Sequence, residues 1–339
     1  AERLTHHLAR AGVVAREVVI GGTGARREAL VELAAPCPAP ETCARRLERL
    51  LEECEGVPWT TVEVRCRHGA EVPGGRGCEV HLMRRAVWQV ACAFASRPRA
   101  GELCSGDSFS RVEPAPALAA VILSDGMGSG PEAARESETA VRLAEAALAA
   151  GAGAGGAIQL ANAVLLARSP DERFATLDVA VLDLASGELE LGKAGAYPTF
   201  LVSAAGVERI EGRALPAGIV AGVEVEPIRR PLQDGDVVLM VTDGAAELGE
   251  AGEGCLEEAL HALRSRTDGP KSPDELLERL MARLDGIAGD QWPDDVTLAL
   301  ITVSQLDVAP VPPYTGSGTK RPVRAAASTG RQRQRQLAR

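Results

Sequence analysis

Three apolar runs in this sequence each meet a carboxylate at one end, and this recurrence constrains the fold more than any other feature. Residues 118–123 lead into Ser124-Asp125-Gly126, and residues 237–242 lead directly into Asp243-Gly244. In the third case the order is reversed, since Asp294-Asp295 stands immediately before the run 296–303. Short apolar runs of this length are typical of buried strands. We therefore predict three central strands that hold carboxylates at sheet edges.

A fourth acidic position, Asp107, lies upstream in Ser105-Gly106-Asp107-Ser108. A single Asp-Gly pair is more often just a good turn, and we interpret Asp234-Gly235 in this way. Several carboxylates buried near one another are costly unless cations or hydrogen bonds compensate them. Mg²⁺ and Mn²⁺ take carboxylate, carbonyl and water oxygens, and a glycine lets a backbone carbonyl approach the ion. The pattern predicts a cation site assembled from distant segments.

Composition and charge indicate a large, acidic body with a basic tail. The chain has 339 residues, 45% of them hydrophobic, and carries a net charge of −10. This is enough to bury a full core and favours two domains. From Ser304 onward there are seven Lys or Arg residues against the single acid Asp307, so the remainder is still more acidic. An acidic body argues against nucleic-acid binding as the main function.

The tail, residues 304–339, is rich in Pro, Gly, Ser, Gln and Arg, and we expect it to be disordered. Nucleic-acid binding through this tail is a weak alternative, because Tyr314 is its one aromatic residue on which a base could stack.

Cysteine usage points to a reducing compartment. The eight cysteines include no CxxC pair, so we expect free thiols and a cytoplasmic location for this chain. No apolar run approaches the roughly 18 residues that a membrane helix needs. The chain begins with Ala1 rather than Met. We expect it to be a fragment of a longer protein, and any membrane segment would then lie outside this chain.

The first part, residues 1–85, is predicted to be a small α/β unit. Residues 40–54 have the apolar spacing of an amphipathic helix, residues 60–67 alternate as a strand does, and residues 78–95 form the next extended segment. Cys66, His68, Cys78 and His81 could be imagined as zinc ligands. Their spacing is not a usual zinc pattern, so paired strands around a Gly-rich turn are the favoured interpretation.

Residues 86–303 are predicted to form one layered α+β domain. The patterns indicate a loop over 96–110, two helices over 131–150 and 158–168, and a β-meander over 175–184, 188–194, 199–203 and 207–210. A further helix follows to about residue 287, with Ser272 as N-cap and Pro273 at its first position. Helices inserted between runs of antiparallel strands give layered architectures.

Four short motifs together resemble the PPM-type serine/threonine phosphatases, the phosphatase 2C family. They are Ser105-Gly106-Asp107-Ser108, Ser124-Asp125-Gly126-Met127-Gly128, Thr242-Asp243-Gly244 and Asp294-Asp295-Val296-Thr297. Thr176-Leu177-Asp178 and Leu215-Pro216-Ala217-Gly218 make the chain most similar to the stage II sporulation protein E branch of that family. The resemblance implies a layered antiparallel β-sandwich flanked by helices over about residues 86–303, preceded by a regulatory segment.

The resemblance also implies roles for single residues. Asp125 would bridge two Mn²⁺ or Mg²⁺ ions, with Asp107 and the Gly126 carbonyl completing one site. Asp243 and Asp294 would hold the other ion, and Asp295 would support them from outside. The implied reaction is direct attack by metal-activated water on a phosphoserine, without a phosphoenzyme. Met127 stands where many relatives have a His, so the sequence identifies no general acid.

In the sporulation branch the implied substrate is a phosphorylated anti-anti-sigma protein, whose dephosphorylation activates a sporulation sigma factor. The implied full-length protein is anchored in a membrane, with this part on the cytoplasmic side. The alternatives are a stress-response phosphatase acting on a related protein, and a signalling module that kept the fold but lost turnover. We also expect the helix at 131–150, which follows the Asp125-Gly126 loop, to couple the N-terminal unit or a homodimer contact to catalysis. Ordinary packing of that helix is the alternative.

Overall fold

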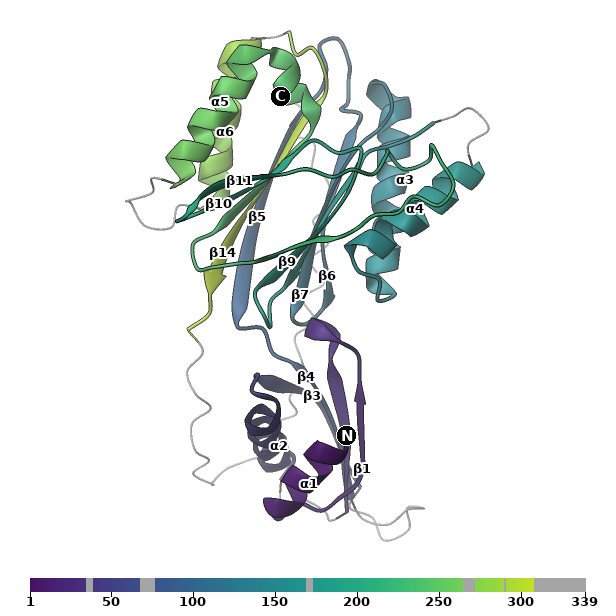
Figure 1. The fold of residues 1–339 in the computed structure, drawn as a ribbon, viewed down its shortest axis with the longest axis vertical. Helices are drawn as coiled ribbons and strands as arrows, with labels where there is room; N and C mark the ends of the chain where they lie inside the picture. The colour runs from purple at the N-terminus through teal and green to yellow at the C-terminus, as the bar shows by residue number, and fades with distance from the viewer. Residues whose placement is uncertain (35–38, 68–76, 169–172, 265–271, 290, 308–339) are drawn as a thin grey trace.

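The structure is a computed structural model that describes residues 1–34, 39–67, 77–168, 173–264, 272–289 and 291–307. Its strands form three antiparallel sheets in the described residues, one of four strands and two of five. Figure 1 shows the four-stranded sheet with its two helices at one end of the molecule and the two larger sheets, flanked by helices, at the other. The predicted α+β architecture of layered antiparallel sheets with flanking helices is confirmed.

The N-terminal unit packs two helices on one four-stranded sheet, whose strand order is β1-β2-β4-β3. Helix α2 starts with Pro40, which suits the first turn, and ends at Gly56, whose φ of +72° is the left-handed cap that glycine favours. Its buried leucines form a separate core with α1 and the sheet. The elements are α1 (Glu2–Arg10), β1 (Ala15–Gly21), the 3₁₀ turn η1 (Gly24–Arg26), β2 (Glu28–Leu33), α2 (Pro40–Glu55), β3 (Trp59–Arg67) and β4 (Gly77–Arg84).

The two larger sheets face each other as a sandwich. One has the strand order β12-β9-β8-β7-β6 and the other β11-β10-β13-β14-β5. Leucine, valine and isoleucine side chains from both sheets fill the space between them. The strands are β5 (Trp88–Arg97), β6 (Asp107–Ala115), β7 (Leu118–Asp125), β8 (Leu177–Asp183), β9 (Glu188–Ala194), β10 (Thr199–Ser203), β11 (Gly206–Ile210), β12 (Ile228–Pro231), β13 (Val237–Val241) and β14 (Val296–Gln305).

Helices cover both outer faces of the sandwich. Helices α3 (Gly130–Ala149) and α4 (Ala154–Arg168) pack on the β7-containing sheet through a core of small side chains, many of them alanine. The 3₁₀ turn η2 (Asp243–Leu248), α5 (Glu250–Arg264) and α6 (Pro273–Ala288) pack on the β13-containing sheet. Figure 1 shows the two helix pairs on opposite sides of the sheets. In the part of the chain that the structure describes, no helix is long and apolar enough to cross a membrane.

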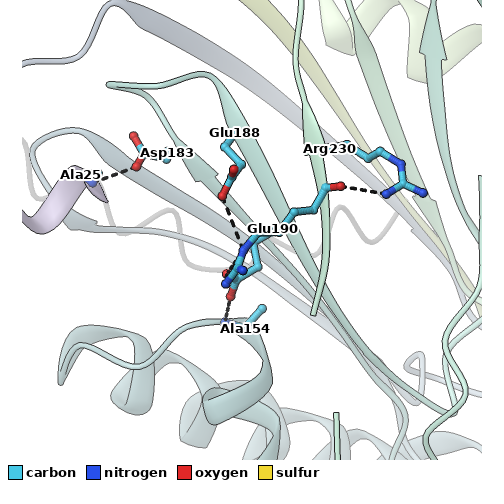
Figure 2. A network of polar contacts seen from close by, with 7 residues as sticks. Ala25, Ala154, Asp183, Glu188, Glu190 and Arg230 are labelled. Atoms are coloured by element: carbon cyan, nitrogen blue, oxygen red, sulfur yellow. Dashed lines mark hydrogen bonds and ion pairs between the residues drawn. The ribbon is translucent and has the colours of Figure 1, made fainter. Parts of the chain in front are cut away.

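The N-terminal unit contacts the sandwich through η1. The backbone N–H of Ala25 donates to Asp183 Oδ2 at 2.8 Å, and the guanidinium of Arg26 donates to the carbonyl of Leu148 near the end of α3. Figure 2 shows Asp183 and, beyond it, Glu190, which accepts a hydrogen bond from the N–H of Ala154 at the start of α4. The N-terminal unit is therefore tied to the end of β8 and to the end of α3.

Several sequence predictions about single elements are confirmed. Ser272 caps α6 by accepting from the N–H of Glu275 at 3.3 Å. Asp234-Gly235 is a turn, since Gly235 has φ +85° and the N–H of Asp236 donates back to the Gln233 carbonyl. The helices predicted at 131–150 and 158–168 are present as α3 and α4.

Other predictions about the elements are wrong. The extended segment 78–95 is two strands, β4 and β5, which belong to different sheets. The meander is also divided, because β8 and β9 lie in one sheet and β10 and β11 in the other. Asp107 lies on the first residue of strand β6 rather than in a loop. Alternation shows where strands lie but not which sheet they join, so the first two errors share one cause.

The division at residues 85 and 86 and the boundary at 303 stay predictions. Strand β14 continues to Gln305, two residues into the predicted tail. The remainder of that tail, 308–339, lies outside the described residues.

Candidate metal centre

The first two carboxylates lie side by side on neighbouring strands. Asp107 on β6 is the direct cross-strand partner of Asp125 on β7. Asp107 is 3% exposed, and its Oδ2 accepts a hydrogen bond from Thr242 Oγ1 at 2.9 Å. Its Oδ1 atom is buried and has no hydrogen-bond partner among the described residues. An unpaired buried carboxylate oxygen is costly, so this atom is suited to a cation or a water.

The backbone at Asp125 and Gly126 is fixed from two sides. The N–H of Asp125 donates to Thr176 Oγ1 at 2.9 Å, and the N–H of Thr176 donates back to the Asp125 carbonyl at 2.8 Å. On the other side, a Cβ added at Gly126 would lie 2.0 Å from the carbonyl oxygen of Ala133 in the first turn of α3. Only glycine fits this close approach of backbone to backbone. The loop geometry is therefore coupled to the position of α3.

The remaining acidic residues come from the second sheet. Asp243 begins η2 directly after β13 and is exposed, while Asp295 precedes β14 and is 2% exposed. Asp295 Oδ1 accepts from the N–H of Arg99 at 2.9 Å, and its buried Oδ2 forms no hydrogen bond within the described ranges of the chain. The N–H of Asp295 donates to Asp294 Oδ1 at 2.8 Å. A Cβ at Gly244 would lie 2.1 Å from the Asp295 carbonyl oxygen, so this turn also requires glycine.

Thr242 joins the two sheets at this point. Its Oγ1 donates to Asp107 Oδ2 in the first sheet and accepts the N–H of Thr297 on β14 at 2.8 Å. Its own N–H donates to the Thr297 carbonyl at 3.0 Å. A single hydroxyl thus aligns the ends of β6, β13 and β14, and with them the three groups of acidic residues.

The electrostatics show carboxylates that repel one another in a partly buried place. Burial raises the pKa of Asp125 to about 9, and the charges of Asp107, Asp243, Asp294 and Asp295 add to the rise. Burial likewise raises the pKa of Asp107 to about 7, with further contributions from Asp295 and Asp243. The pKa of Asp295 is also raised mainly by burial, and the pKa of Asp243, although that residue is exposed, is raised mainly because nearby atoms keep water from its carboxylate. A cation bound among these groups would remove much of this penalty.

The donors present fit a hard divalent cation. They are carboxylates and the carbonyl of a glycine, which Mg²⁺ and Mn²⁺ prefer. Asp107 and Asp295 each have a buried oxygen that no described residue contacts by a hydrogen bond. Among the described residues, no three His, Cys, Asp or Glu side chains already converge on one point closely enough to form a metal site. The fit therefore rests on donor type, charge and the unpaired oxygens.

The acidic residues predicted to form the site all lie at one end of the sandwich. The charges of Asp107, Asp243, Asp294 and Asp295 all raise the pKa of Asp125, which they do only from close by. Two polar residues of this region were not predicted from the sequence. The carboxylate of Glu102 accepts from Ser129 Oγ at 3.3 Å beside this loop. Lys193 is a lysine inside a predicted strand, and a charge at a position expected to be buried is the signal that marks it.

The zinc alternative in the N-terminal unit gains no support. Cys66 and Cys78 are cross-strand partners on β3 and β4, with their sulfurs 3.1 Å apart. His81 Nε2 lies 2.8 Å from Glu28 Oε2 on the neighbouring strand β2. His68 lies outside the described residues. The two sulfurs are explained by strand pairing, as the sequence favoured.

An antiparallel sandwich covered by two helix pairs, with carboxylates gathered at one end of both sheets, defines a protein of the PPM or phosphatase 2C fold. In agreement, the profile of the stage II sporulation protein E family matches residues 116–304. The chain belongs to this family.

Individual relatives support the same assignment. The chain is 30% identical over 218 residues to stage II sporulation protein E of Bacillus subtilis strain 168, which covers 64% of this chain and 26% of that protein. The chain thus spans about a quarter of the length of that relative.

Two solved structures show the same fold. One contains the PP2C phosphatase domain and a fragment of the regulatory domain of SpoIIE from Bacillus subtilis; its TM-score is 0.68 at 23% identity, over 91% of this chain and 87% of that chain. RsbX in complex with magnesium has a TM-score of 0.50 at 18% identity, over 63% of this chain and 96% of that chain.

Proposed function

We propose that this chain is a metal-dependent protein serine phosphatase that dephosphorylates an anti-anti-sigma protein and so activates a sporulation sigma factor. The observation that carries the proposal is the group of mutually repelling carboxylates from both sheets. In this group Asp107 and Asp295 keep buried oxygens that have no hydrogen-bond partner in the residues that the structure describes. Membership of the sporulation family supports the substrate class.

The residues have distinct roles in this proposal. Asp107, Asp125 and the Gly126 carbonyl would hold one Mn²⁺ or Mg²⁺, and Asp125, Asp243 and Asp294 the other. Such a pair of ions supplies an activated water and neutralises charge on the phosphoryl group. The structure's own contribution is orientation: Thr242 fixes Asp107, and Thr176 fixes the backbone of Asp125. Asp295 would support the site without binding an ion, and its Oδ1 accepts a hydrogen bond from the N–H of Arg99.

The test is Mn²⁺-dependent release of phosphate from a phosphoserine anti-anti-sigma protein. Asp125→Ala removes the proposed bridging ligand and should abolish the activity. Asp234→Ala is a matched control, because it changes the same Asp-Gly dipeptide at a turn where the Asp side chain only accepts from the N–H of Gln305. Equal activity in all three proteins would refute the site. Activity on a generic phosphate ester but not on the protein would keep the chemistry and refute the substrate.

Regulation through α3 is part of the same proposal. Gly126 contacts the first turn of α3, and Arg26 of the N-terminal unit donates to Leu148 at the other end of that helix. A shift of α3 would therefore move the Gly126 carbonyl and change metal affinity. Ala140, fully buried in the middle of α3, offers a test, since Ala140→Pro breaks the helix. Unchanged activity and regulation in that variant would refute the coupling. A homodimer contact on α3 would act through the same route.

The non-catalytic alternative is disfavoured by the retention of every acidic position that the site needs. The stress-response alternative differs only in the protein substrate, and a comparison of the two phosphorylated proteins as substrates separates them. We further propose that the full-length protein is anchored in a membrane through a segment outside this chain, with this part on the cytoplasmic side. Fractionation of cells that express the full-length protein, followed by protease treatment, tests this placement.

A further inference from the structure

A buried ion pair lies between the two sheets beside the candidate metal centre. Lys193 on β9 is the cross-strand partner of Asp178 on β8, and its ammonium donates to Asp178 Oδ2. Thr199, on β10 of the other sheet, donates its hydroxyl to the same Oδ2 at 2.6 Å and accepts from Lys193 Nζ at 2.8 Å. All three residues are at most 2% exposed. The lysine thus donates to both other members of the group, and both bonds to the Asp178 carboxylate use Oδ2.

The other oxygen of this carboxylate is left over. Asp178 Oδ1 is buried, and no group in the part of the chain that the structure describes forms a hydrogen bond with it. The residue lines a small cavity of about 20 Å³ together with Asp125, Thr176, Tyr197 and Asp243. A water needs about 10–15 Å³ of such space and two or more polar partners, so the cavity has room for one. An unpaired carboxylate oxygen in a cavity of that size points to a water as its partner.

Strand register places the Asp178 side chain on the metal-centre side of the sheet. Asp178 is paired with Leu123 on β7, and Asp125 follows two residues later on the same strand. Side chains two residues apart share one face of a strand. Asp178 and Asp125 therefore lie on the same face of the sheet, the face that looks into the sandwich.

We infer that Asp178, anchored by Lys193 and Thr199, is a positioning residue whose Oδ1 accepts a hydrogen bond from a water held beside Asp125 and Asp243. The inference rests on the proposed function, since the water matters only if cations bind there. An ionised carboxylate only accepts hydrogen bonds, so the water must point a proton at Asp178 and its lone pairs away from it. The positive charge of Lys193 offsets the negative charge of Asp178. The Asp178 carboxylate therefore adds little repulsion to the other carboxylates of the site.

A purely structural role is the rival explanation, because the pair also links two sheets. Buried ion pairs can often be replaced by apolar residues of similar volume with no loss of stability. The rival therefore predicts that an apolar replacement folds and binds metal as the wild type does. Our inference predicts that it folds but binds metal more weakly. The reason is that loss of a group that orients a metal ligand by a hydrogen bond typically lowers metal affinity or activity about 10–100-fold.

The experiment uses the triple variant Asp178→Val/Lys193→Met/Thr199→Val of the full chain, which removes all three polar groups together. Binding of Mn²⁺ without substrate is measured from the electron paramagnetic resonance signal of the free ion, and stability from thermal unfolding in a chelator. We expect similar unfolding temperatures and a dissociation constant for Mn²⁺ raised about tenfold or more. Asp236→Asn is the control, since Asp236 is equally buried but accepts from the N–H of Gln233 in a turn.

The outcomes separate the two proposals. A triple variant whose Mn²⁺ affinity stays within about twofold of wild type overturns the inference about Asp178 and leaves the proposed phosphatase intact. A wild-type chain that binds no Mn²⁺ overturns both. If the variant does not fold, a crystal structure of the wild-type chain with Mn²⁺ decides the question. A water within hydrogen-bond distance of Asp178 Oδ1 supports the inference, and an oxygen without a water, or one bound directly to the ion, refutes it.

Discussion

Replacement of Gly126 by alanine should weaken both the fold and the candidate metal centre. The new Cβ would lie 2.0 Å from the carbonyl oxygen of Ala133 and 2.7 Å from its carbonyl carbon. Real Cβ atoms essentially never come closer than 3.0 Å to such neighbours, so the loop and the first turn of α3 must separate by the difference of 1.0 Å. The neighbour is backbone inside a helix, which cannot rotate away as a side chain would.

The size of the effect follows from the cost of overpacking. Inserting one methyl group into a filled core costs about 1–3 kcal/mol. Because the obstacle is a rigid backbone carbonyl, we expect Gly126→Ala to lower the free energy of unfolding by about 3 kcal/mol, the upper limit of this range. For a domain of this size each kcal/mol lowers the unfolding temperature by about 2–4 °C, so we expect a fall of roughly 6–12 °C in a chelator. The displaced Gly126 carbonyl should also weaken Mn²⁺ binding, measured by titration.

Gly254→Ala is the matched control. Gly254 lies inside α5 and has open space where a Cβ would be placed. The same substitution there should stabilise the chain by up to about 1 kcal/mol, because alanine favours a helix more than glycine does. The reasoning would be refuted by a Gly126→Ala variant that unfolds at the wild-type temperature and binds Mn²⁺ normally.

Three further predictions follow from the geometry of the site and of the N-terminal unit. Burial raises the pKa of Asp125 from 3.8 to about 9, so the folded chain keeps a proton that the unfolded chain releases. In a chelator, stability against urea should therefore fall as the pH rises between these values, and an unchanged midpoint would contradict this. Asp295→Asn keeps an oxygen for its backbone partner, so phosphate release should fall by at most about tenfold, whereas Asp125→Ala should lose it. Finally, a mild oxidant should join Cys66 and Cys78, whose sulfurs are 3.1 Å apart, so that two fewer thiols react with a thiol reagent. Cys66→Ser should prevent this, and an unchanged thiol count in the wild type would refute it.

The strands that carry the site could be predicted because each has a strong local signal. The run before Asp125 is apolar throughout, and in the structure its residues up to Ser124 are all buried, as expected for an inner strand. Asp243 and Asp294-Asp295 were found for the same reason. Which sheet a strand joins depends instead on contacts between residues far apart in the chain. The segments 78–95 and 188–203 each contain a crossing between sheets that no local pattern marks.

Helices α1 and α5 were not predicted, and the sequence of α5 shows why. Helix α5 contains Gly252 and Gly254, which lower helix propensity, yet Cys255, Leu256 and Leu260 bury its inner face on the sheet. Tertiary packing stabilises this helix where local preference does not. The polar supports of the site were hidden in a similar way. Thr242 became important only when the fold placed its hydroxyl between Asp107 and Thr297.

The alignment of both sheets at Thr242 has a consequence for how the molecule opens. Ions held by Asp107 and Asp125 in one sheet and by Asp243 and Asp294 in the other would act as a reversible cross-link between the two layers. A ligand that binds only the closed form stabilises it by about 2.7 kcal/mol at a hundredfold excess over its dissociation constant. The supply of free divalent ions would then set how often the layers separate. A protease that cuts the separated form would degrade the chain fastest when those ions are scarce.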